Sequence, residues 1–216
     1  MGRHFRHLSG MLACFTGLAI VAATSAPAIA GWGKVVSVEE HWELQVSEPD
    51  PERSAPQVTM VMSPNGNVDG VHFLFTLNHS NAPDFASGGM QVQSWQGGDF
   101  LEEHSGSDNA TLNHSGETVR WAQRVTIADG NITFQVRDGS SETWGAFGGD
   151  DLSLGVSTSQ SNLNSYRPAV SLSESQVSYA ENRVVSLTLT KLVWVTEDGE
   201  VHEQSAPIPI DTSLDQ

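Results

Sequence analysis

Apolar and polar residues alternate at every second position over most of the chain that follows residue 30. Trp42 and Leu44 alternate with polar neighbours, and the same spacing recurs in 71–77, 119–127 and 187–195. Side chains two positions apart lie on the same face of a β-strand, so this period indicates strands with one buried face. No window of about ten residues shows a helical period, and we expect very little helix.

Turn-forming residues separate the alternating segments. The sequences Ala128-Asp129-Gly130-Asn131 and Glu197-Asp198-Gly199-Glu200 are typical of β-hairpin turns, because Gly and Asn tolerate positive φ angles. Short strands joined in this way, about ten to thirteen of them, favour an all-β fold. We expect a two-sheet antiparallel β-sandwich of jelly-roll, lectin-like type, and a closed barrel is the alternative.

The first thirty residues have the features of a secretory signal peptide. Arg3 and Arg6 precede an apolar run over 11–23, and Ala28-Ile29-Ala30 supplies small residues for cleavage before Gly31. The run of about 13 residues is shorter than the ~20 that a membrane-spanning helix needs. Cys14 resembles a lipoprotein cysteine, but apolar residues continue after it. We therefore predict a signal at 1–30, one domain at 31–216, and a secreted or periplasmic protein that is not integral to a membrane.

Composition narrows the function classes. The 216 residues include 10 Lys+Arg against 26 Asp+Glu, a formal charge of −16, which disfavours binding to nucleic-acid phosphates. A single Cys excludes a disulfide framework and a multi-cysteine zinc site. We expect no cofactor, although the paired carboxylates of Asp150 and Asp151 make a structural calcium ion conceivable.

Motifs for hydrolysis are weak. The chain has no G-x-S-x-G nucleophile elbow. The segment Glu39-Glu40-His41-Trp42-Glu43 approaches the carboxylate pattern of sandwich glycosidases, but the odd offset between Glu40 and Glu43 puts them on opposite strand faces. The sequence therefore favours a non-catalytic protein. A polysaccharide-processing glycosidase or lyase, and a structural surface or matrix protein, are the alternatives.

Tryptophans offer the main candidates for ligand binding. Trp95 and Trp194 alternate in step with polar rather than apolar positions, and Asp99 follows Trp95 in a Gly-rich turn. Trp144 lies in a Gly-rich segment that ends at the acidic pair. Exposed aromatic rings stack on sugars, so we predict that these four residues bind a glycan or another extracellular polymer. The alternative is that a loop covers these rings. Trp42 and Trp121 share parity with aliphatic residues and are expected in the core.

Overall fold

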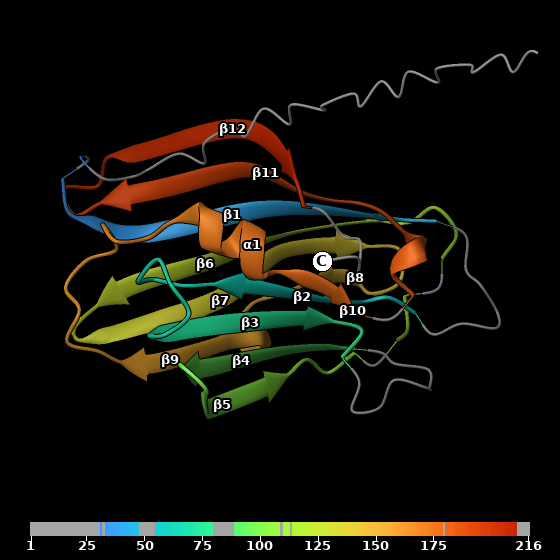
Figure 1. The fold of residues 1–216 in the computed structure, drawn as a ribbon, viewed down its shortest axis with the longest axis horizontal. Coiled ribbons are helices and arrows are strands. Elements are labelled where there is room, and N and C mark those ends of the chain that lie inside the picture. The colour runs from blue at the N-terminus through green and yellow to red at the C-terminus, as the bar shows by residue number, and fades with distance from the viewer. Residues whose placement is uncertain are drawn as a thin grey trace, which may run out of the picture.

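The computed structural model describes residues 31, 33–47, 55–79, 89–108, 110–112, 114–178 and 180–210. Two antiparallel sheets pack face to face (Figure 1), which confirms the expected all-β sandwich. The predicted signal peptide lies outside the described residues. Within the described part of the chain, no helix has the length and apolar character to cross a membrane.

The two sheets differ in size and connection. The larger has the order β12-β11-β1-β6-β7-β8, with β9 also paired to β7, and the smaller has the order β10-β2-β3-β4-β5. The strands of the larger sheet are β1 (Val35–Val46), β6 (Thr118–Ala128), β7 (Asn131–Ser141), β8 (Gly145–Phe147), β9 (Ser153–Ser157), β11 (Val184–Thr196) and β12 (Val201–Pro209). Those of the smaller sheet are β2 (Gln57–Met62), β3 (Val71–Leu77), β4 (Met90–Gln96), β5 (Asp99–Ser105) and β10 (Gln176–Ser178).

The apolar faces of the alternating segments in β1, β3 and β6 lie in the core, as expected, whereas the alternation in 187–195 is interrupted. Trp42 on β1 pairs in register with Trp121 on β6, and both side chains are buried. Across the sandwich, the rings of Phe73 on β3 and Phe134 on β7 stack with centroids 5.2 Å apart. Aromatic contacts between the sheets therefore contribute to the buried apolar core that stabilises the fold.

Both predicted hairpin turns are present. Asp129 and Gly130 join β6 to β7 with φ angles of 50° and 74°, the mirror-image turn geometry that suits twisted strands. Gly199, with φ 85°, lies in the turn between β11 and β12. β12 is the outermost strand of the larger sheet and contains Pro207 and Pro209.

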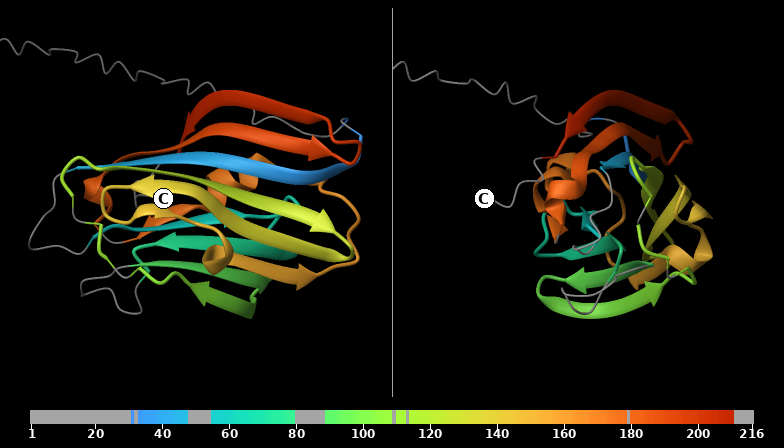
Figure 2. Two further views of the ribbon diagram at one scale, coloured as in Figure 1. Left: turned by 180° about the vertical axis from the view of Figure 1, so that it is seen from behind. Right: turned by 90° about the vertical axis from the view of Figure 1, so that its right-hand side faces the viewer.

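A short helix, α1 (Pro168–Glu174), closes one side of the sandwich. It lies between β1 of the larger sheet and β2 of the smaller one (Figures 1 and 2). At its end, the backbone N–H of Val61 on β2 donates to Ser175 Oγ, 2.9 Å away. Two 3-10 turns, η1 (Asp150–Leu152) and η2 (Glu181–Arg183), complete the described elements.

Candidate functional site

A carboxylate lies inside the sandwich at the middle of β1. Glu40 is 0% exposed, because its position on the strand puts it on the same face as Val38 and Trp42. The Trp42 indole N–H donates to Glu40 Oε2 at 3.1 Å. Gln123 pairs with Glu40 in the β1–β6 register, and its Nε2 donates to the same oxygen at 2.6 Å.

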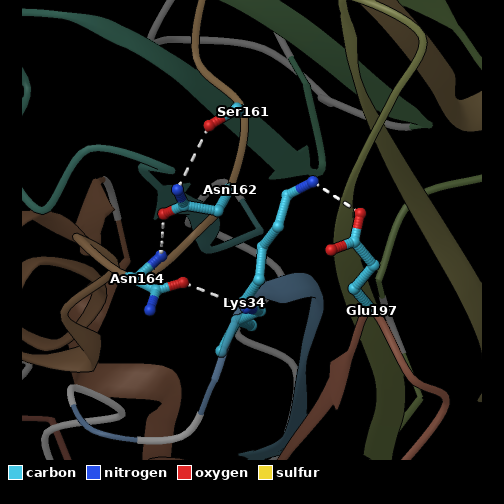
Figure 3. A network of polar contacts seen from close by, with 6 residues as sticks. Lys34, Ser161, Asn162, Asn164 and Glu197 are labelled. Atoms are coloured by element: carbon cyan, nitrogen blue, oxygen red, sulfur yellow. Dashed lines mark hydrogen bonds and ion pairs between the residues drawn. The ribbon is translucent and has the colours of Figure 1, made fainter.

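The second oxygen of Glu40 is bound from a distant part of the chain. The phenol of Tyr166, in the connection between β9 and α1, donates to Glu40 Oε1, and Tyr166 is itself fully buried. This connection is fastened to the start of β1, where the backbone N–H of Val35 donates to Asn164 Oδ1 at 2.9 Å. Asn162 Oδ1 in turn accepts from the Asn164 backbone N–H at 3.0 Å (Figure 3).

Burial has the largest effect on the pKa values of Glu40 and Tyr166. Desolvation raises the pKa of the Glu40 carboxyl above its ordinary value, because the charged form loses its hydration. The polar side chains around the carboxyl pull its pKa back down, in decreasing order Tyr166, Ser171, Gln123 and Trp42. Burial also raises the pKa of the Tyr166 phenol, and the neighbouring Glu40 charge adds to that effect.

One acceptor at this site has no donor. Gln123 Oε1 is buried and receives no hydrogen bond within the described residues. A buried amide oxygen in this state is costly, and a water molecule is the usual partner for such an atom. A carboxyl of raised pKa beside an amide can transfer a proton and donate to a polarised carbonyl. We call Glu40, Gln123, Tyr166 and Trp42 the Glu40 cluster.

Glu117, which is also fully buried, has a different role. Its two oxygens accept hydrogen bonds from the Thr143 backbone N–H at 2.8 Å and the Thr143 hydroxyl at 2.6 Å. The Val46 N–H donates to the Glu117 carbonyl, so Glu117 lies at the far end of β1 from Glu40. Six strand residues separate the two levels, which is roughly 20 Å. The two glutamates therefore cannot act on one bond.

The opposite face of β1 is charged and faces outward. Glu43 accepts from Arg120 at 2.8 Å, so Glu40 and Glu43 do lie on opposite faces, as their spacing predicts. Glu39 contacts His41 at 2.8 Å and Arg137 at 3.5 Å. The hydrogen bond from His41 is the main reason why the pKa of Glu39 is lowered.

The predicted glycan-binding residues do not form one surface. Trp95 and Asp99 belong to the β4–β5 hairpin, Trp144 follows β7, and Trp194 lies on β11. Trp144 and Trp194 are only 6% and 5% exposed, so their faces are not available to stack on a sugar. Trp95 is half-buried, and its ring packs against Phe100 with centroids 5.4 Å apart. The expectation of a glycan-binding surface formed by these four residues is therefore wrong.

A β-bulge explains the error at Trp194. In the β1–β11 pairing, His41 is opposite Lys191 but Trp42 is opposite Leu189, so one residue of β11 is extra. The bulge reverses the parity of β11, and Trp194 points inward opposite Val38. There its ring stacks on His202 with centroids 5.5 Å apart.

The acidic pair proposed for calcium lies at the start of η1. Asp150 and Asp151 are both exposed, and no group of three or more potential metal ligands occurs among the described residues. Calcium at this position stays a prediction.

Sequence reasoning missed Gln123 and Tyr166 and rejected Glu40 as part of a carboxylate pair. A signal for Glu40 was available, because it shares parity with Trp42 and Leu44 and is therefore a charged residue on the apolar face. The position of Gln123 opposite Glu40 depends on the β1–β6 register, which cannot be read from the sequence. Tyr166 lies 126 positions from Glu40, and no local pattern connects them.

Comparisons with known proteins give one kind of match. No family model and no curated protein matches the chain. Among solved structures, the chain is similar to scytalido-glutamic peptidase with a peptide-based transition-state analogue, at a TM-score of 0.31 and 13% identity, covering 82% of this chain and 83% of that chain. For the same peptidase with a transition-state analogue inhibitor, the TM-score is 0.33 and the identity 10%, and the match covers 81% of this chain and 82% of that chain. For SCP-B, an eqolisin-family peptidase in complex with Ala-Ile-His, the TM-score is 0.31 and the identity 12%, and the match covers 82% of this chain and 83% of that chain.

Proposed function

We propose that the protein is a hydrolase that cleaves the bond between a carbonyl carbon and its leaving group, such as a peptide bond, with Glu40 as general acid and base. One observation carries this proposal. The buried Glu40 carboxylate, whose pKa is raised, lies 2.6 Å from the side-chain nitrogen of Gln123 on the neighbouring strand. Perturbed carboxyls of this kind occur preferentially at catalytic sites.

The chemistry needs only groups of the Glu40 cluster and a water molecule. Ionised Glu40 takes a proton from the water, whose oxygen forms a bond to the substrate carbonyl carbon. The second N–H of Gln123 donates to the carbonyl oxygen as negative charge develops there. The unpaired Gln123 Oε1 accepts the other hydrogen of the water. Protonated Glu40 then gives its proton to the leaving nitrogen, and the carbon–nitrogen bond breaks.

Substrate access requires the segment over Glu40 to move. Tyr166 and the start of α1 cover the carboxyl. The helix has seven residues and no side-chain cap at its N-terminus, so it has little stability of its own. Displacing it leaves the β1–β6 ladder, and hence the Glu40–Gln123 pair, intact.

The test is cleavage of an unfolded protein and of fluorogenic peptides by the purified chain, from acidic to neutral pH. Glu40→Gln keeps the size of the side chain and is expected to lower the rate about 10²- to 10⁴-fold. Glu43→Gln is the matched control, since it changes a glutamate of the same strand on the outer face. Equal rates for wild type and Glu40→Gln, or no cleavage by the folded wild type at any pH, overturn the proposal.

We further propose that the chain acts outside the cytoplasm, on the basis of the signal-like residues 1–30. Mass spectrometry of protein recovered from the periplasm or medium of expressing cells should show an N-terminus at Gly31. Protein retained in the cytoplasm with Met1 or Gly2 at its N-terminus contradicts this assignment.

A further inference from the structure

The chain between β9 and β10 forms a strap over Glu40. We use this name for residues 160–175, which include Tyr166 and α1. α1 lies between β1 of the larger sheet and β2 of the smaller one (Figure 1), so the strap spans both sheets at the position of the Glu40 carboxyl. With the strap in this position, Glu40 is completely buried.

Both ends of the strap are fixed to the sheets. At the first end, the Leu163 N–H donates to the Val35 carbonyl at 2.8 Å. The β2–β3 loop packs against this end, because a Cβ added at Gly66 would overlap the Ser165 carbonyl oxygen. At the second end, the strap continues directly into β10, which pairs with β2. Movement of the strap is therefore expected in its middle part, 166–174.

The middle of the strap is held by side chains and not by backbone pairing. The Tyr166 hydroxyl donates to Glu40 Oε1, and Ser171 lies beside the same carboxyl. Pro168 is buried, and Leu172 packs against the core. The other backbone hydrogen bonds found here among the described residues run within the strap itself. The contact between Tyr166 and Glu40 is therefore the one whose loss should release this part.

The Tyr166 hydroxyl occupies the carboxylate oxygen that a reacting water needs. Trp42 and Gln123 both donate to Oε2 of Glu40, whereas Tyr166 donates to Oε1. A general base must lie within hydrogen-bond reach of the proton that it takes. Oε1 can meet a water molecule only after Tyr166 has left it, so the closed strap and the proposed reaction exclude each other.

We infer that the middle of the strap, 166–174, is an autoinhibitory lid, and that the Tyr166 hydroxyl is the latch that holds it closed on Glu40. The lid opens without unfolding of the sandwich, because the β1–β6 pairing does not depend on Tyr166. Its inhibitory effect rests on the proposed catalytic role of Glu40, whereas its opening does not. A reaction that requires the open state proceeds in proportion to the fraction of open molecules.

Opening is measured by coupling carboxyl groups to glycinamide with a carbodiimide and locating the products by peptide mass spectrometry. In the wild type, Glu40 should be labelled faster than Glu117, which is equally buried but lies at the far end of β1. Tyr166→Phe removes the latch hydroxyl and should speed the labelling of Glu40 about tenfold, with Glu117 unchanged. Ser165→Ala is the matched control, because it removes a hydroxyl from the neighbouring exposed residue, and it should be labelled as the wild type is.

Equal labelling of Glu40 and Glu117 in the wild type means that Glu40 becomes accessible only on unfolding, and it overturns the proposal. Equal labelling of Glu40 in the wild type and Tyr166→Phe, or the same increase in Ser165→Ala, overturns the latch.

Peptide cleavage separates the lid from the proposed function. At low substrate concentration, Tyr166→Phe should cleave about tenfold faster than the wild type, because more molecules are open. Slower cleavage shows that the phenol takes part in the reaction, and it overturns the inhibitory role of Tyr166. Faster labelling of Glu40 without cleavage by any variant contradicts the proposed function and supports the lid.

Discussion

Gln123 lies directly opposite Glu40 on the neighbouring strand, with its amide nitrogen 2.6 Å from a Glu40 carboxylate oxygen. The backbone pairing of β1 with β6 sets this register, so the two side chains meet without any loop to position them. The Glu40–Gln123 pair is therefore as rigid as the sheet, and the contribution of each cluster residue can be measured by single substitutions.

Removing the Glu40 carboxylate should destabilise the protein much more than neutralising it. Glu40→Ala leaves the Tyr166 hydroxyl and the Trp42 and Gln123 N–H groups without their acceptor, at a cost of about 3–5 kcal/mol in the free energy of unfolding. Glu40→Gln retains an acceptor oxygen and should cost much less. Urea unfolding measures both. A loss of less than about 1 kcal/mol in Glu40→Ala, which is the net contribution of one ordinary hydrogen bond, contradicts the importance of the cluster.

The stability of the wild type should depend on pH through Glu40. Its pKa is raised in the folded state above the ordinary 4.5, so the folded protein binds this proton more tightly than the unfolded chain. The resulting stability is complete below pH 4.5 and is lost as pH rises through the folded-state pKa.

Urea unfolding of the wild type and Glu40→Gln across this range isolates the effect, because all other titrating groups are common to both. The wild type should lose stability relative to Glu40→Gln as the pH increases. A difference that is constant with pH, or that changes in the opposite direction, contradicts the raised pKa.

The bulge in β11 predicts which side chains of this strand stabilise the core. Trp194→Ala should cost about 3–5 kcal/mol of unfolding free energy, because it leaves a cavity opposite Val38. Val195→Ala, on the outward face one position away, should cost less than about 1 kcal/mol. Thermal or urea unfolding compares the two. A larger loss of stability in Val195→Ala than in Trp194→Ala would contradict the bulge and favour an uninterrupted alternation in β11.

The turn at Gly148 should not tolerate a side chain. A Cβ there lies 2.8 Å from both Arg137 Cα and Val136 O, so Gly148→Ala should destabilise the fold by about 1–3 kcal/mol. Gly155→Ala on β9 is the control, since nothing lies within 4 Å of its Cβ, and it should change stability by less than about 0.5 kcal/mol. Similar melting temperatures for the two variants would contradict the close approach.

Parity in the sequence predicts the fold well and the site poorly. Trp42 and Trp121 were placed in the core correctly, because β1 and β6 keep an uninterrupted alternation between these residues. The same rule failed at Trp194, because one extra residue in β11 shifts the alternation and no residue type marks that position. Tyr166 reaches Glu40 through a long connection, so its role depends on tertiary packing that local patterns do not contain.

The position of β12 at the end of the larger sheet has a consequence for self-assembly. An outermost strand can accept a strand from another molecule and extend into fibres, provided that its backbone offers a continuous row of donors. Pro207 and Pro209 have no N–H, so any such addition is interrupted in the second half of β12. Among the described strands, β12 thus combines an outer position in its sheet with two prolines that limit the addition of another strand along it.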